Sequence, residues 1–198
     1  MAIWLPPTDT SGNTGTEPTG AANGDTLVAI AYTSGSTIPT LATGWTSIAA
    51  VATTHWGEGI RIAKIQRGAS APSYLFTNAS RVIVYGMHGS VVFANVSAGI
   101  GDNTSSASPT SPPALGAGGI DGIVTWISLN FATITPPPSF TSDFNTSGHA
   151  TSHALYNAVA GGPYSWGLDT AQVSATATIR FAVPTPPSNG SLPLLGVV

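Results

Sequence analysis

The sequence feature that most constrains the fold is a strict alternation of apolar and polar side chains over residues 173–183. Apolar side chains fill every second position, at Val173, Ala175, Ala177, Ile179, Phe181 and Val183, and the positions between them include Ser174, Thr176, Thr178 and Arg180. Successive side chains of a β-strand point to opposite faces of the sheet, whereas a helix repeats every 3.6 residues. A period of two therefore predicts a strand with one buried face and one wet face.

Short apolar runs bounded by turn-forming residues recur along the rest of the chain, and such runs predict further strands. The expected strands cover residues 26–32, 45–53, 60–66, 74–77, 81–87, 91–96, 123–131 and 153–160. No stretch shows a convincing helical period, so helix content should be small. The sequence predicts an all-β protein, an antiparallel β-sandwich of jelly-roll or immunoglobulin-like type.

The chain divides into one sandwich and two flanks. Residues 6–24 contain almost nothing apolar, so we expect residues 1–23 to form an N-terminal arm, residues 24–183 the sandwich and residues 184–198 a C-terminal tail. Residues 101–119 are rich in proline and glycine and are either a linker between two domains or a crossover within one. Each half has few large apolar side chains, which favours a single domain.

The two halves of the sandwich share a spacing pattern that suggests an internal duplication. The motif Asp25-x-Leu27-Val28 is followed by Trp45, and Asp121-x-Ile123-Val124 is followed by Phe140; later, Tyr74-x-Phe76 has a counterpart in Tyr164-x-Trp166. The alternative is that turn-rich β chains look alike at this level of detail. The sequence leaves both explanations open.

Sparse charge limits the possible partners. Only 7% of the residues are charged, where a globular domain carries about 25%. The nearest approach to a basic cluster is Arg61, Lys64 and Arg67, too few cations to bind a phosphate backbone. The chain has no cysteine, which excludes disulfides and thiolate metal ligands. Without a basic cluster we expect no nucleic-acid partner. The chain also lacks a recognisable leader and any long apolar run, so we expect no membrane partner.

The sequence offers few candidates for chemistry. His149 and His153 are four residues apart, which in a strand places them on one face but about 13 Å apart, too far for one metal ion. We expect these histidines to be solvated, and we expect no metal and no cofactor. Eight acidic residues exist, mostly in or before turns, and no nucleophile-elbow motif accompanies them. A Ser–His–Asp triad assembled in space is a weak alternative.

The most functional-looking segment contains His55, Trp56 and Glu58. An aromatic ring beside a carboxylate on a loop suits stacking on a sugar and hydrogen bonding to its hydroxyl groups. The favoured alternative is that Trp56 packs over a sheet edge or against a neighbouring subunit. A glycan ligand at this loop therefore stays an open possibility.

The order and spacing of several motifs resemble a family of bacteriophage virion β-sandwich proteins. The motifs are Gly24-Asp25-Thr26-Leu27-Val28-Ala29, then Pro39, Gly44-Trp45-Thr46, Ser73-Tyr74-x-Phe76-Thr77 and Ala154-x-Tyr156-x-x-Val159-Ala160-Gly161-Gly162. The resemblance covers about residues 24 to 183, and Phe140 stands where a second Gly-Trp is expected. It implies a structural role without catalytic residues.

These observations together lead to a functional expectation. We expect a non-enzymatic virion protein, a capsid decoration or cement protein that binds the major capsid protein or another virion protein and forms a homo-oligomer, a dimer or trimer. The expected anchors are apolar residues of the two flanks: Trp4, Leu5, Leu192, Leu194 and Leu195. The alternatives are a tail-fibre or head-fibre module that binds a receptor or carbohydrate and, more weakly, a secreted hydrolase.

Overall fold

The computed structural model describes residues 3–55, 57–88, 96–114, 120–128, 132–146, 148–154 and 162–181. All regular structure in these residues is β-strand. The strands are β1 (Ile3–Ser11), β2 (Thr26–Thr33), β3 (Thr46–Ala52), β4 (Gly59–Gln66), β5 (Arg81–His88), β6 (Ser97–Ser106), β7 (Thr110–Ser111), β8 (Ile120–Ile127), β9 (Ile134–Thr135), β10 (Phe140–Thr146), β11 (His149–Ala154), β12 (Tyr164–Ser165), β13 (Gly167–Leu168) and β14 (Gln172–Phe181). The prediction of an all-β chain is confirmed.

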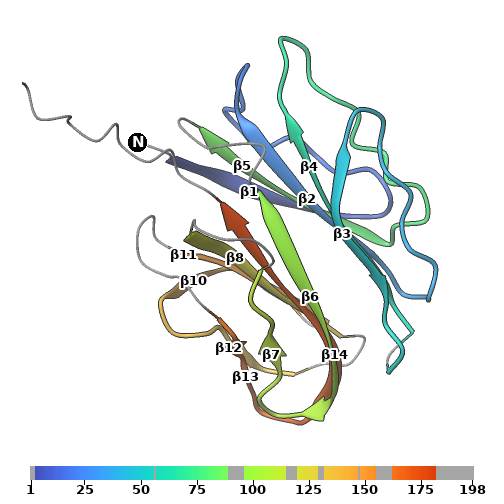
Figure 1. Ribbon diagram of the computed structural model, residues 1–198, viewed down its shortest axis with the longest axis vertical. Helices are drawn as coiled ribbons and strands as arrows, with labels where there is room; N and C mark the ends of the chain where they lie inside the picture. Colours follow the sequence, from blue (N-terminus) through green and yellow to red (C-terminus); the bar gives the residue numbers. More distant parts are fainter. Residues whose placement is uncertain are drawn as a thin grey trace, which may run out of the picture.

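Two five-stranded antiparallel sheets form the two layers of a β-sandwich (Figure 1). The first sheet has the order β1-β5-β2-β4-β3, and the second has the order β10-β11-β8-β14-β6. In the chain, the N-terminal half builds the first sheet and the C-terminal half builds the second. Two short pairs, β12 with β7 and β13 with β9, lie outside the main sheets.

The two sheets have the same connectivity, which supports the internal duplication. Replacing β1, β2, β3, β4 and β5 by β6, β8, β10, β11 and β14 turns the order of the first sheet into that of the second. The match is one of strand order and not of register, because Ala29 and its partners Ala63 and Val84 face outward, whereas Thr125 and its partners Thr151 and Ala177 face the other sheet. Each half is therefore one copy of the same sheet topology.

The core lies between the two sheets and is built from the facing sides of both. Its buried members are Val28, Ile30, Tyr32, Ile60, Ile62, Ile83, Tyr85, Met87, Val96, Ala98, Ile123, Ile127, Ala175, Ala177, Ile179 and Phe181. β-Branched residues dominate this list and suit strands packed on a pleated surface. Burial of this apolar surface is the main force that holds the layers together.

The outer face of each sheet is also covered, by loops that carry aromatic side chains. Trp45, Tyr74 and Phe76 cover the first sheet, and Phe140, Tyr164 and Trp166 cover the second. Trp45 meets Tyr74 edge-on at 5.7 Å between ring centroids, and Phe140 meets Tyr164 in the same way at 5.0 Å. These are the aromatic residues that matched in the sequence, so the duplication extends to the covering loops.

This covering corrects the expectation of a wet face on the last strand. Ser174, Thr176 and Thr178 of β14 are fully buried, although their side chains point away from the central core. The segment at β7 crosses over them, and the Thr176 hydroxyl donates a hydrogen bond to the carbonyl of Thr110 at 2.7 Å. Alternation predicted the strand correctly but gave no sign of the segment that lies over its polar face.

The expected N-terminal arm is also corrected. Residues 3–11 form β1, which pairs antiparallel with β5 along its length and is an edge strand of the first sheet. Pro6 and Pro7 lie where the register shifts, and a bulge accommodates them because proline cannot donate to a ladder. The sandwich therefore begins near residue 3, and the expected tail at 184–198 lies outside the described residues.

Two further strands were expected, at residues 74–77 and 91–96. Residues 74–77 do not form a strand; Leu75 makes only an isolated bridge to Thr14. This segment is instead one of the loops that cover the first sheet. The expected strand at 91–96 lies outside the described residues except for Val96, and β6 begins directly after it.

Candidate functional site

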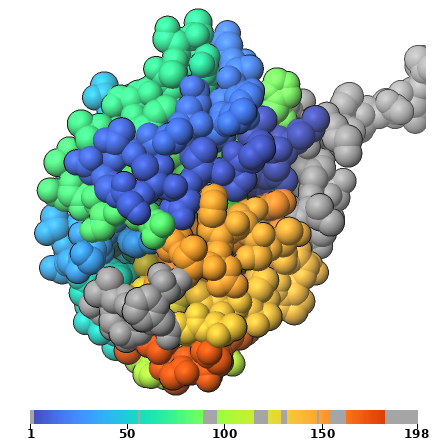
Figure 2. Space-filling model, turned by 180° about the vertical axis from the view of Figure 1, so that it is seen from behind, coloured from blue at the N-terminus to red at the C-terminus, as the bar shows by residue number. Residues whose placement is uncertain are grey.

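Charged side chains gather where β1 and β5 of the first sheet lie over β10 and β11 of the second. We call this margin the first seam; Figure 2 shows the N-terminal segment running beside the segment of β10 and β11. Asp9 on β1 accepts hydrogen bonds there from two residues. The Arg81 Nε atom lies 2.6 Å from Asp9 Oδ1, and the His149 Nε2 atom lies 2.9 Å from Asp9 Oδ2. The Asp9 carboxylate thus joins the two sheets.

The electrostatics of this cluster favour the ionised carboxylate. Burial by itself raises the pKa of Asp9, but hydrogen bonds from His149 and Arg81 outweigh it and hold the pKa below its ordinary value. Burial by itself lowers the pKa of Arg81, but its interactions with Asp9 and Tyr32 outweigh burial and raise the pKa above its ordinary value. Burial raises the pKa of Tyr32, so this hydroxyl stays protonated. The cluster is a paired, hydrogen-bonded charge network.

The arrangement of Thr146, His149 and Asp9 superficially resembles a nucleophile–base–acid triad. The Thr146 hydroxyl lies 2.9 Å from His149 Nδ1, but it also lies 3.3 Å from Nε2, so it is not aligned with the lone pair of one nitrogen. An Arg81 nitrogen lies 3.3 Å from the same Nδ1, and the imidazole is buried. With Nε2 donating to Asp9, Nδ1 accepts from these donors. The geometry therefore fits a structural link and not an activated hydroxyl.

A second polar cluster lies in the same seam. The Tyr85 hydroxyl of β5 lies 2.8 Å from Asp143 Oδ2 on β10 and 2.7 Å from the Thr151 hydroxyl on β11. Since a hydroxyl has one proton, Tyr85 donates to the carboxylate and accepts from Thr151. His153 Nδ1 lies 2.6 Å from Asp143 Oδ1. Burial, together with the Asp143 charge, raises the pKa of Tyr85 well above its ordinary value.

The opposite margin of the sandwich, where β3 lies beside β6, is the second seam and is linked more simply. Asp102 on β6 accepts hydrogen bonds from the backbone and hydroxyl groups of Thr54, at 2.7 and 2.8 Å. His55 Nδ1 lies 3.1 Å from the same oxygen. Burial raises the pKa of Asp102, and the bonds from Thr54 and His55 outweigh it and lower the pKa. This carboxylate also bridges the two sheets.

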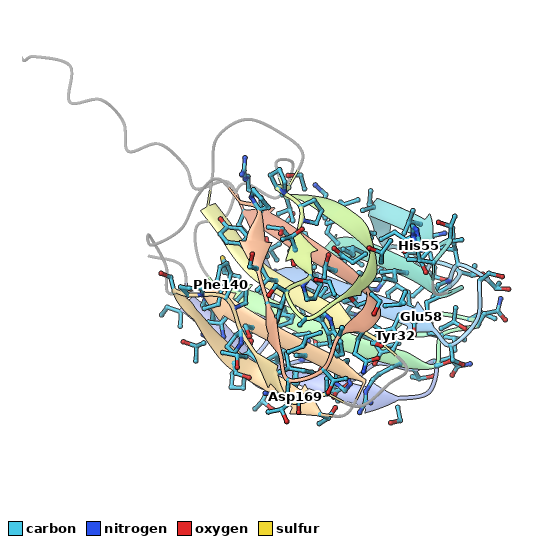
Figure 3. All side chains as sticks on the ribbon, turned by 90° about the horizontal axis from the view of Figure 1, so that it is seen from below. Tyr32, His55, Glu58, Phe140 and Asp169 are labelled. Carbon is cyan, nitrogen blue, oxygen red and sulfur yellow. The ribbon has the colours of Figure 1, made fainter. Side chains whose placement is uncertain are left out.

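The segment predicted to bind a ligand is therefore used differently. His55 pairs with Asp102, and the Glu58 side chain is fully buried, with its backbone bonded to Thr53. Figure 3 shows the labelled Glu58 close to Tyr32, and its charge contributes to the raised pKa of Tyr32. Trp56 lies outside the described residues. Of the two described candidates, His55 is accessible enough to meet a ligand and Glu58 is not.

The N-terminal anchors also have intramolecular contacts. Trp4 is partly buried against the core; its ring meets Phe181 edge-on at 5.3 Å and lies 5.6 Å from the ring of His153. The Leu5 side chain packs so closely on Gly86 that a Cβ there would lie 2.8 Å from it. Both residues therefore belong to the sandwich and not to a separate arm. Leu192, Leu194 and Leu195 lie outside the described residues.

The paired histidines differ in part from expectation. They do lie on one strand, β11, but His149 is buried rather than solvated, and each imidazole is bonded to its own aspartate. Among the described residues, no three histidine, aspartate or glutamate side chains come together in a way that would hold a metal ion. His88 pairs with Asp25 at 2.7 Å, so each histidine of the chain has an aspartate partner.

Sequence reasoning missed these clusters because they join distant residues. Asp9 and His149 are 140 positions apart, and no local pattern connects them. The only available signal was composition: the chain has eight acids and four histidines, and a carboxylate that folding takes out of water needs a hydrogen-bonding partner. Asp25 and Asp169 do accept backbone N–H groups near turns, as predicted for most acids.

The exterior carries few charged side chains, and most of them are paired within the protein. Most charged side chains of the described residues have intramolecular hydrogen-bond or ion-pair partners: Asp9, Glu17, Asp25, Arg61, Lys64, Arg67, Arg81, Asp102, Asp143 and Asp169. What remains on the exterior is chiefly serine, threonine, asparagine, glycine, proline and alanine. Contacts of this surface with a partner will depend little on salt.

Comparison with known proteins adds no identity to this picture. No protein-family model matches the chain, and neither curated proteins nor solved structures give a match. Within the described residues no helix is both long and apolar enough to span a bilayer. The geometry of the two seams and the low charge of the exterior are therefore the basis for the functional argument.

Proposed function

We propose that this chain is a non-enzymatic structural protein of a bacteriophage virion, a capsid decoration or cement protein that binds the capsid lattice and neighbouring copies. The observation that carries the proposal is the small number of charged side chains, most of them paired within the protein, which leaves an exterior of low charge that is rich in hydroxyl groups. Such a surface adheres through apolar contacts and hydrogen bonds rather than through charge.

The chemistry of the seams supports a structural role over a catalytic one. The buried His149 imidazole is held by Asp9, and Arg81 occupies the side on which a general base would accept a proton. The Asp143 cluster is likewise a closed set of hydrogen bonds between two sheets. Both clusters resist separation of the layers, which suits a protein that must keep its shape on a particle.

The sequence resemblance supports the virion setting. The motifs at residues 24–29, 44–46 and 73–77 occur in the same order in phage virion β-sandwich proteins. In this chain those segments form β2, the start of β3 and the covering loop of the first sheet. The resemblance and the low charge of the exterior are independent arguments for the same role.

The proposal is tested by measuring how much of the protein is present in purified particles of the phage that carries its gene. Quantitative mass spectrometry should find a stoichiometry comparable with that of the major capsid protein. A few copies per particle would instead favour the fibre alternative, and absence from particles would refute a virion role.

The second part of the test uses salt. Purified protein should rebind particles stripped of it, and retention should be unchanged between low salt and about 1 M NaCl, where the Debye length is only about 3 Å. A steep loss of binding with salt would show that charges carry the attachment, contrary to the argument from the low charge of the exterior.

A further inference from the structure

The four edges of the two sheets are not protected in the same way. Edge strands expose unpaired N–H and C=O groups, and proteins block them with proline, charge, bulges or covering segments. β1 carries Pro6 and Pro7 at its bulge, and β10 carries Asp143 at its bulge. β6 carries Asp102 and is covered by the segment at β7, where the backbone N–H of Thr110 donates to the Asn103 side chain at 3.2 Å.

β3 also has a bulge, at Ile48, but it differs from the other three edges in composition. Its residues, Thr46-Ser47-Ile48-Ala49-Ala50-Val51-Ala52, include no charge, no proline and no glycine. Within the described part of the chain, β4 is the only strand that pairs with it, so its outer side has no strand partner. Ala50 and Ala52 are exposed, and Ile48 and Ala49 pack against the core. The bulge limits the regular part of this edge to residues 49–52, and over that part an edge without charge or proline can accept another strand.

We propose that β3 pairs antiparallel with β3 of a second copy, so that the first sheets of two copies join into one continuous sheet. This deepens the proposed function, on which it rests for its setting, by naming the contact between neighbouring copies. Antiparallel pairing of like strands has two-fold symmetry, so both copies satisfy the same backbone groups at once. Small side chains along β3 let the two edges approach to hydrogen-bonding distance.

Charge does not oppose a second copy at this edge. Two cations lie on the neighbouring strand β4: Lys64 is buried and donates to the Val96 carbonyl, and Arg61 donates to the carbonyl of Pro39 and to the Ser47 hydroxyl. In the joined sheet the two β4 strands would be three strand spacings apart, about 14 Å. That separation exceeds the Debye length of about 8 Å in physiological salt, so repulsion between the two guanidinium groups is largely screened. β10 would instead bring Asp143 of two copies together.

The test measures the oligomeric state of the full chain by sedimentation velocity up to about 100 μM. The wild type should form a dimer. Ala50→Lys should raise the dimer dissociation constant about tenfold or more, because like charges then meet across the pair. Thr141→Lys on the equivalent strand β10 is the matched control and should leave the dimer unchanged. Far-UV circular dichroism and thermal melting verify that both variants fold.

Charge complementation makes the test specific to β3. A mixture of Ala50→Lys and Ala50→Glu should restore dimers, since pairing of like strands brings the two substituted positions close together. A monomeric wild type would overturn the proposal and leave the edge to a different protein. Equal weakening by Thr141→Lys, or no rescue in the mixture, would also overturn it. Particle binding is measured separately, so a dimer that does not bind particles would refute the proposed function and leave the β3 contact standing.

Discussion

Substitution of Asp9 by asparagine tests whether the first seam locks the two sheets together. The variant keeps the size of the side chain but removes the charge that accepts from Arg81 and His149. A hydrogen bond to a charged group contributes about 1.5–3 kcal/mol. Two effects reduce the loss: the asparagine oxygen can still accept one hydrogen bond, and Arg81, with 27% of its side chain exposed, regains some contact with water. We therefore expect a loss of about 2–4 kcal/mol in the free energy of unfolding.

Urea unfolding at pH 7 and at lower pH measures this effect. Because the folded-state pKa of Asp9 is depressed, its contribution is present above the unfolded pKa near 4 and is lost as pH falls through the lower folded pKa. The difference between wild type and Asp9→Asn should therefore be full at pH 7 and shrink below about pH 4. The melting temperature at pH 7 should fall by about 5–12 °C. A difference below about 1 kcal/mol, or one that stays constant with pH, would refute this account of the seam.

Three further substitutions test other parts of the fold by the same unfolding measurement. Trp166→Ala removes a fully buried ring that covers the second sheet, and it should cost about 3–5 kcal/mol; a cost below about 1 kcal/mol would mean that the loop is not packed as described. Tyr85→Phe leaves Asp143 and Thr151 without their shared partner and should cost about 1–3 kcal/mol, whereas a neutral result would remove the second cluster from the argument. Gly59→Ala places a Cβ against the backbone of Thr37 and Ile38, so the variant should be destabilised by steric overlap. Unchanged stability would contradict that close approach.

The fold could be predicted from the sequence wherever burial imposes a period. The runs at 26–32, 60–66 and 81–87 match β2, β4 and β5 within one residue at each end, because both faces of these central strands are buried and apolar. β1 and β6 were missed since edge strands have only one neighbour and carry polar, proline or glycine residues. Their pairing depends on the strand beside them and not on their own pattern.

The candidate site could not be predicted in the same way. Each polar link joins residues that the topology brings together from opposite halves of the chain, as with Asp9 and His149 or Tyr85 and Asp143. In the sequence these residues are isolated side chains without a visible partner, which is why solvated histidines were expected. It also placed the anchors in an arm, because the segment around Pro6 and Pro7 has the composition of a loop and only the ladder with β5 shows it to be a strand.

The internal duplication separates what the fold requires from what this chain adds to it. The aromatic covers occur in both halves at corresponding positions, Tyr74 and Phe76 in one and Tyr164 and Trp166 in the other, because each sheet needs its outer face shielded from water. The seams and edges do not correspond: two aspartate clusters link the first seam, whereas Asp102 and the hydrogen bond from Lys64 to the Val96 carbonyl link the second. β10 carries a charge at its bulge, whereas its counterpart β3 carries none. Since both strands occupy the same place in the same topology, folding alone does not explain the difference, and a partner for the β3 edge does.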